Sequence, residues 1–149
     1  DPDLTKLIEG CGALVVSDRF CFGSTPGREV IELKDDEDAL RQICLHVMEH
    51  SECARYIADE KVLQRRETAD RLAKEYKAEG IIYEQMKYCD YWGFERALAS
   101  HIMHDEYGWP VLSIDRLYNN GNSGQLRTRV QAFVESLEIK RIHKEEGKA

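Results

Sequence analysis

The residue with the clearest chemical potential is Cys89, in the segment Lys87-Tyr88-Cys89-Asp90. An apolar run at 81–83 just before it is typical of a buried strand, and a helix is expected after it. In parallel sheets ligands bind outside the strand ends, and a helix N-terminus favours negatively charged groups such as a thiolate. Cys89 is therefore a candidate metal ligand or nucleophile. Spacing alone leaves the alternative open, because a single cysteine is more often a small buried apolar side chain.

Three further residues are candidates because of where they lie relative to Cys89 or to a predicted strand. Cys21 follows an apolar run at 13–16, as Cys89 follows its own strand, and Lys87 and Asp90 are close neighbours of Cys89. Cys21, Lys87 and Asp90 are thus candidates for the second layer of a site built around Cys89. Carboxylates at strand ends also cap helices or neutralise nearby Lys and Arg side chains, and this structural role is the commoner alternative for Asp90.

The loop before the last expected helix ends in Ser123-Gly124-Gln125, and Arg127 and Arg129 follow within the helix. The side chains of this loop are small, so backbone N–H groups at the helix start are accessible to a phosphate or to a thioester oxygen. Ser123, Gly124 and Gln125 are therefore candidate substrate-binding residues. A plain turn with Ser123 as the helix N-cap explains the same pattern equally well.

The remaining cysteine and histidine positions carry weaker signals. His46, His50 and Cys53 have a spacing that suits zinc, but they project away from the apolar stripe of their helix onto its solvated face. Cys44 falls on that apolar stripe and is predicted to lie in the core. We therefore expect no metal in this helix.

Length and composition exclude several classes of protein. The chain has 149 residues, the usual size of one domain, with 42% hydrophobic and 33% charged residues. No apolar run approaches the ~20 residues that cross a bilayer, so no membrane partner is expected. The net charge of −7 argues against a nucleic-acid partner. Five cysteines without close pairs, and no signal-peptide core, indicate a reducing, cytoplasmic setting.

The apolar pattern predicts one α/β domain over residues 1–149. Strands separated by helices favour an open parallel sheet flanked by helices on both faces, a three-layer domain of the Rossmann or flavodoxin type. The loops after the strands should then converge on one edge. Strands are expected at 13–17, 81–85 and 111–114, and helices at 4–8, from 35–38 to 48, and at 59–77, 94–102 and 126–137. The helical faces predicted to point inward are Leu40/Ile43/Cys44/Val47/Met48, Phe94/Leu98/Ile102 and Leu126/Val130/Phe133/Val134/Leu137.

Three sequence blocks stand in order along the chain. They are Gly-Ala-Leu-Val-Val-Ser-Asp-Arg-Phe-Cys-Phe-Gly-Ser at 12–24, Gly-Ile-Ile-Tyr-Glu-Gln-Met-Lys-Tyr-Cys-Asp at 80–90, and Ser-Gly-Gln-Leu-Arg-Thr-Arg at 123–129. The ordered set resembles the family of ATP-dependent benzoyl-CoA reductases and (R)-2-hydroxyacyl-CoA dehydratases, over essentially the whole chain. The chain begins with Asp1-Pro2 rather than Met, so we expect it to be a piece of a longer protein. The resemblance implies that this piece is the C-terminal domain of a larger subunit.

The resemblance implies an iron–sulfur enzyme that processes an acyl-CoA. It implies that the C-terminal domain supplies one cysteine, matched here by Cys89, to a [4Fe–4S] cluster, and that the other thiolates come from an N-terminal portion without a counterpart in this chain. This piece alone is expected to hold no cluster, because such a cluster takes four ligands. The implied partners are the acyl-CoA substrate, a homologous second subunit and an ATP-dependent activator protein that donates electrons.

We expect the benzoyl-CoA reductase branch, which reduces an aromatic ring, because of the aromatic residues around Cys89 and the block at 123–129. The (R)-2-hydroxyacyl-CoA dehydratase branch, which eliminates a hydroxyl group, is the alternative. A different class is a non-catalytic flavodoxin-like binding or electron-transfer domain. A binding domain predicts that Cys89 is dispensable and that the intact subunit contains no iron, whereas an electron-transfer subunit predicts iron without acyl-CoA binding.

Overall fold

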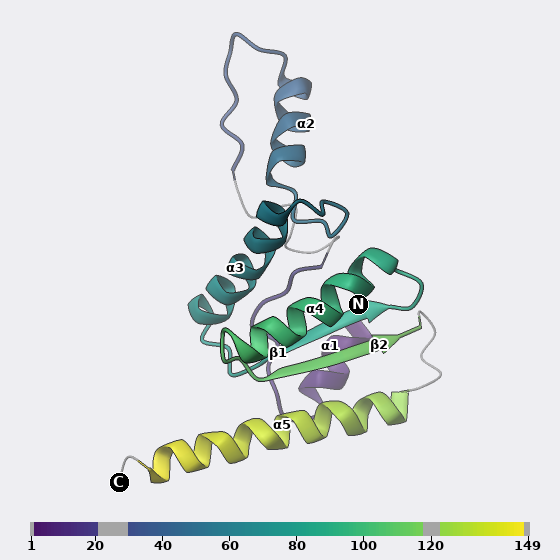
Figure 1. Cartoon of the computed structure of the whole chain (residues 1–149), viewed down its shortest axis with the longest axis vertical. Coiled ribbons are helices and arrows are strands. Elements are labelled where there is room, and N and C mark those ends of the chain that lie inside the picture. Colours follow the sequence, from purple (N-terminus) through teal and green to yellow (C-terminus); the bar gives the residue numbers. More distant parts are fainter. Residues whose placement is uncertain (1, 21–29, 118–122, 148–149) are drawn as a thin grey trace.

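The computed structural model describes residues 2–20, 30–117 and 123–147. Within these residues a small sheet is surrounded by helices (Figure 1). The elements in chain order are α1 (Pro2–Glu9), α2 (Ala39–His50), α3 (Asp59–Glu75), β1 (Ile81–Met86), α4 (Asp90–Asp105), β2 (Val111–Arg116) and α5 (Ser123–Glu146). None of the described helices combines the length and the apolar character that a bilayer crossing demands.

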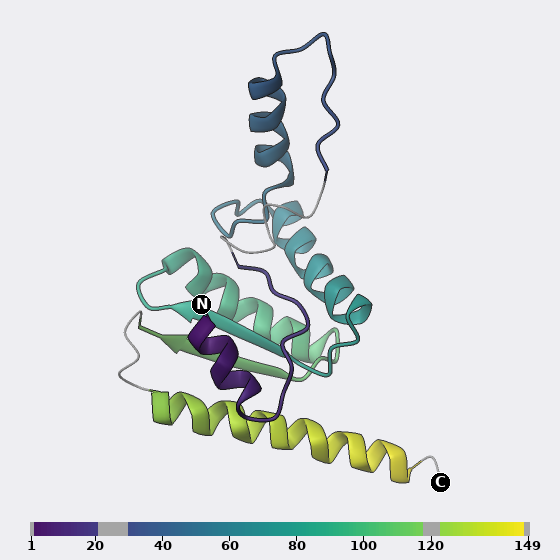
Figure 2. The same cartoon turned by 180° about the vertical axis from the view of Figure 1, so that it is seen from behind.

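The sheet consists of β1 and β2, which run parallel and are joined by α4. Their register pairs Ile81 with Val111 at one end and Met86 with Arg116 at the other. Helix α4 packs against both strands on one face, whereas α1 lies on the opposite face and α5 runs beneath the sheet in both views (Figures 1 and 2). The prediction of an open parallel α/β sheet with helices on both faces is confirmed for this part of the chain, although two strands do not establish a complete three-layer domain.

The core lies on the α1/α5 face of the sheet. Its buried members are the apolar side chains Leu4, Ile8, Ile114, Val130 and Val134. They come from one face each of α1 and α5 and from the inner side of β2, because residues three or four apart share a helical face. The apolar stripe predicted for the last helix is therefore correct, and the short helix predicted at 4–8 contributes Leu4 and Ile8 to the core.

The prediction of a first strand at 13–17 is wrong, because the described residues of this segment pair with neither strand of the sheet. Ala13 and Val15 pack against the core, but the Leu14 side chain is 74% exposed. A run of four apolar residues looks like a strand buried on both faces, yet only alternate side chains are covered here. Cys21, expected to follow this strand, lies outside the described residues.

Two helical faces predicted to be core are exposed. On α4 the buried side chains are Glu95, Ala99 and Met103, while Phe94 is 84% exposed. The buried face is shifted by one residue, which rotates it by about 100° around the helix. On α2, which stands away from the sheet (Figure 1), the apolar stripe has no cover within the described residues, and the thiol of Cys44 is exposed rather than core. The exposed apolar side chains of α2 are Leu40, Ile43, Leu45, Val47 and Met48.

A buried ion pair joins α3 to α4. The guanidinium of Arg65 lies 2.7 Å from the carboxylate of Glu95, and these side chains are only 2% and 8% exposed. Arg65 also donates to the carbonyl of Tyr56 at 2.7 Å. Arg19 donates to the carbonyl of Arg65 at 2.9 Å and pairs with Glu52 at 2.8 Å. This network ties the segment that ends at Phe20 to α3 and α4 through charged groups rather than through apolar packing.

Candidate functional site

The candidate site lies where β1 and β2 end. Because the strands are parallel, their carboxyl ends meet at one edge, and α4 and α5 both begin there (Figure 1). The N–H of Lys87 extends the ladder by donating to the carbonyl of Arg116 at 2.8 Å. The Lys87 ammonium also lies 3.8 Å from the carboxylate of Asp115. The structure thus brings Lys87, which follows β1, to the end of β2.

Cys89 occupies a tight turn between β1 and α4. Tyr88 adopts a positive φ of 73°, which is rare for a residue with a side chain. The N–H of Cys89 donates to the carbonyl of Met86 at 3.1 Å, and the Cys89 carbonyl accepts from Gly93 N–H at 2.9 Å. Cys89 is the N-cap residue of α4, but its side chain makes no capping hydrogen bond. The half-buried thiol is therefore free to bind a group outside this turn.

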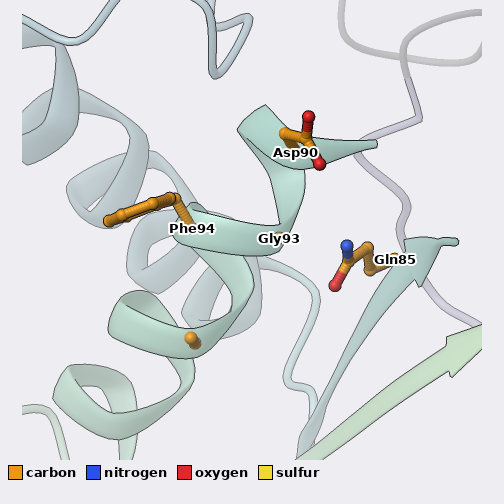
Figure 3. A pocket seen from close by; sticks show the side chains of 5 residues that line it. Gln85, Asp90, Gly93 and Phe94 are labelled. Carbon is orange, nitrogen blue, oxygen red and sulfur yellow. The ribbon is translucent and has the colours of Figure 1, made fainter. Parts of the chain in front are cut away.

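A shallow depression adjoins this turn. It is lined by Gln85, Asp90, Gly93, Phe94 and Ala97. Figure 3 shows the Gln85 side chain reaching from β1 toward the turn of α4 that contains Gly93, with Asp90 one turn earlier and Phe94 directed away from the strand. Asp90, a predicted neighbour of Cys89, is exposed in the first turn of α4, where a carboxylate complements the helix N-terminus.

A polar network under the Cys89 turn was not predicted. The Gln85 amide donates to the carbonyl of Cys89 at 3.2 Å and accepts from Arg96 Nε at 2.9 Å. Arg96 also donates to the Ser113 hydroxyl at 2.9 Å, and Arg129 of α5 donates to the Ser113 carbonyl at 2.7 Å. The only sequence signal was a glutamine near the end of the strand predicted at 81–85, which the structure extends to Met86.

Tyr83 lies in the same layer, on the side of β1 that faces α4. Burial raises the pKa of its phenol to about 12; the nearby carboxylate of Glu95 also raises it, while Arg19 and Arg66 act in the opposite direction. The phenol is therefore neutral at physiological pH.

At the start of α5 the structure places Ser123, Gly124 and Gln125 in the first helical turn. A side chain built on Gly124 would meet nothing within 4 Å, so the space above this backbone is open. The two arginines expected to add charge here are engaged elsewhere, Arg127 with the carbonyl of Gly10 at 3.3 Å and Arg129 with Ser113. The loop residues at 118–122 lie outside the described part of the chain.

The chain is similar to one described protein family over most of its length. The family model described as "2-hydroxyglutaryl-CoA dehydratase, D-component" matches residues 1–137 of the chain. The chain belongs to this D-component family. Of the two branches expected from the sequence, the match supports the dehydratase side, which was the alternative, and does not specifically support benzoyl-CoA reductase.

A relative of the D-component chain occurs in Escherichia coli (strain K12), where it is provisionally named dehydratase subunit YjiM. The two sequences are 26% identical over 135 residues, which cover 90% of this chain but only 33% of the relative. The chain thus spans about one third of the length of the curated relative it matches.

The positions of the free thiols show how many ligands this chain could give to an iron–sulfur cluster. Within the described ranges no group of three or more His, Cys, Asp or Glu side chains is arranged to hold a metal ion. Cys89 is a free thiol at the strand-end edge, whereas Cys44 lies on the remote helix α2. A four-iron cluster takes four ligands, usually thiolates. The described residues therefore fit the donation of one ligand and not a complete site.

Proposed function

We propose that this chain is part of a subunit of a 2-hydroxyacyl-CoA dehydratase, and that Cys89 is its ligand to a [4Fe–4S] cluster. The observation that carries the proposal is the position of Cys89: a free thiol in a turn fixed by backbone hydrogen bonds, at the edge where α4 and α5 begin. The family match over residues 1–137 supports the dehydratase class.

In this proposal the remaining ligands come from other parts of a longer subunit, and the cluster supplies electrons at low potential when bound. The residues of this chain have two roles. Cys89 binds the iron, and the first turn of α5 binds the thioester carbonyl or a phosphate of the acyl-CoA through backbone N–H groups at Gly124 and Gln125, which have no partner within the helix. A second dehydratase subunit and an ATP-dependent activator protein complete the enzyme.

The overall reaction distinguishes the dehydratase from a reductase. A 2-hydroxyacyl-CoA loses its hydroxyl group and a hydrogen from the neighbouring carbon as water, so no net oxidation or reduction occurs. Ring reduction of benzoyl-CoA instead consumes electrons stoichiometrically. The electron demand of the intact enzyme therefore separates the two branches, whichever acyl group is the natural one.

The test uses the intact subunit, purified without oxygen together with its partner subunit and activator. We expect conversion of an (R)-2-hydroxyacyl-CoA to the enoyl-CoA, with many turnovers per electron supplied, and no reduction of benzoyl-CoA. Stoichiometric ring reduction would assign the subunit to the reductase branch instead. A subunit without iron and without either activity would favour the non-catalytic binding domain.

The role of α5 is tested by Gly124→Leu. Because nothing lies within 4 Å of the added Cβ, the variant should fold normally, yet its side chain would occupy the space above the backbone N–H groups. We expect acyl-CoA affinity of the intact subunit to fall about tenfold or more, as for a steric clash in a packed site. Isothermal titration calorimetry measures the affinity, with Ala132→Leu at an exposed position of the same helix as the control. Unchanged affinity in folded Gly124→Leu would exclude this substrate site.

A further inference from the structure

The Gln85 side chain can be oriented from its partners alone. The guanidinium of Arg96 carries only donors, so the amide atom 2.9 Å from Arg96 Nε must be the oxygen. The amide nitrogen then points at the Cys89 carbonyl, 3.2 Å away. Arg96 is itself held by the Ser113 hydroxyl at 2.9 Å, so the orientation of the amide is fixed from β2.

Gly93 allows this arrangement. A Cβ on Gly93 would lie 2.7 Å from the Gln85 amide nitrogen, closer than real Cβ atoms approach. The absence of a side chain lets Gln85 lie against the first turn of α4. The Cys89 carbonyl consequently accepts two hydrogen bonds, from Gly93 N–H at 2.9 Å and from Gln85.

We infer that Gln85, held by Arg96 and accommodated by Gly93, is the positioning residue that fixes the Cys89 turn and so aims its thiol. Tyr88 next to Cys89 adopts a positive φ of 73°, a conformation that surrounding contacts must maintain. The contact from Gln85 is the side-chain hydrogen bond that holds the Cys89 carbonyl. The inference rests on the proposed function only for the identity of the group that the thiol binds.

Two substitutions disturb the same contact in different ways. Gln85→Glu keeps the size of the side chain and its acceptor for Arg96, but replaces the donor facing Cys89 with a second acceptor. Gly93→Ala keeps Gln85 and Arg96 and pushes the amide away from the turn. Gln131→Glu, on an exposed face of α5, makes the same chemical change away from the strand-end edge and serves as the control.

The measurement is the rate of Cys89 alkylation by iodoacetamide in the intact, iron-depleted subunit, followed by peptide mass spectrometry. Loss of the hydrogen bond should loosen the turn and accelerate alkylation about three- to tenfold in both variants, but not in Gln131→Glu. In the iron-loaded subunit both variants should also shift the electron paramagnetic resonance signal. Alkylation rates that stay within about twofold of wild type, or that fall, would overturn the inference.

These outcomes separate the inference from the proposed function. If Cys89→Ala retained full iron, Cys89 would not be a ligand, yet the alkylation rates would still decide whether Gln85 positions its thiol. If Cys89→Ala lost its iron while Gln85→Glu and Gly93→Ala reacted as wild type, only the positioning role would be excluded.

Discussion

In the intact subunit, the Cys89→Ala variant is expected to lose iron and turnover together while keeping its fold. Alanine cannot bind iron, and a four-iron cluster deprived of one thiolate loses both stability and its characteristic potential. The fold should survive because the Cys89 backbone bonds to Met86 and Gly93 do not involve the side chain, and because the thiol is only half-buried. Iron content, the electron paramagnetic resonance spectrum and turnover are measured after anaerobic purification.

Cys44→Ala provides the matched control, since Cys44 is an exposed thiol on α2, away from the sheet (Figure 1). This variant should retain wild-type iron, spectrum and turnover. Full iron with an unaltered spectrum in Cys89→Ala would remove Cys89 from the site and with it the chemical basis of the proposed function. Loss of iron in both variants would point instead to a general requirement for thiols.

The second large effect is expected for Glu95→Ala, which breaks the buried ion pair with Arg65. Removal of one partner leaves the Arg65 charge buried without compensation, because its side chain is only 2% exposed. Such a loss costs about 3–5 kcal/mol of the free energy of unfolding. Urea unfolding of the chain, followed by the fluorescence of Trp92 and Trp109, measures this change.

Two further variants show whether the buried charge causes the loss. Glu75→Ala removes the partner of Arg71 in an exposed pair, whose side chains are 63% and 54% exposed, and should cost no more than about 1 kcal/mol. The double variant Arg65→Met/Glu95→Leu removes both buried charges and should be more stable than Glu95→Ala. A loss below about 1 kcal/mol in Glu95→Ala would mean that water reaches Arg65.

The same ion pair explains why the sequence predicted the wrong face of α4. Phe94, Leu98 and Ile102 form an apolar stripe that looks like core, whereas Glu95 would be placed in solvent by any local pattern. Glu95 is nevertheless buried because Arg65, thirty residues earlier on α3, neutralises it. A tertiary contact of this kind leaves no trace in helical periodicity.

Other parts of the fold were predictable because local patterns agree with tertiary burial. In α1 and α5 the apolar stripes contain the residues that are buried, including Ile8 and Val130. The turn after β1 also followed from the order of strand and helix. The hydrogen bond from Gln85 to the Cys89 carbonyl could not be predicted. It depends on Arg96 and Ser113, and these side chains meet only once β1 and β2 are in register.

Ser113 has a consequence for ligand binding at the strand-end edge. Its hydroxyl accepts from Arg96 of α4 and its carbonyl accepts from Arg129 of α5, so one residue of β2 links both helices. The helix starts at that edge are therefore preorganised: their relative orientation is fixed when the chain folds. A ligand that spans both starts would lose less conformational entropy of the protein on binding than one that had to align two independent helices.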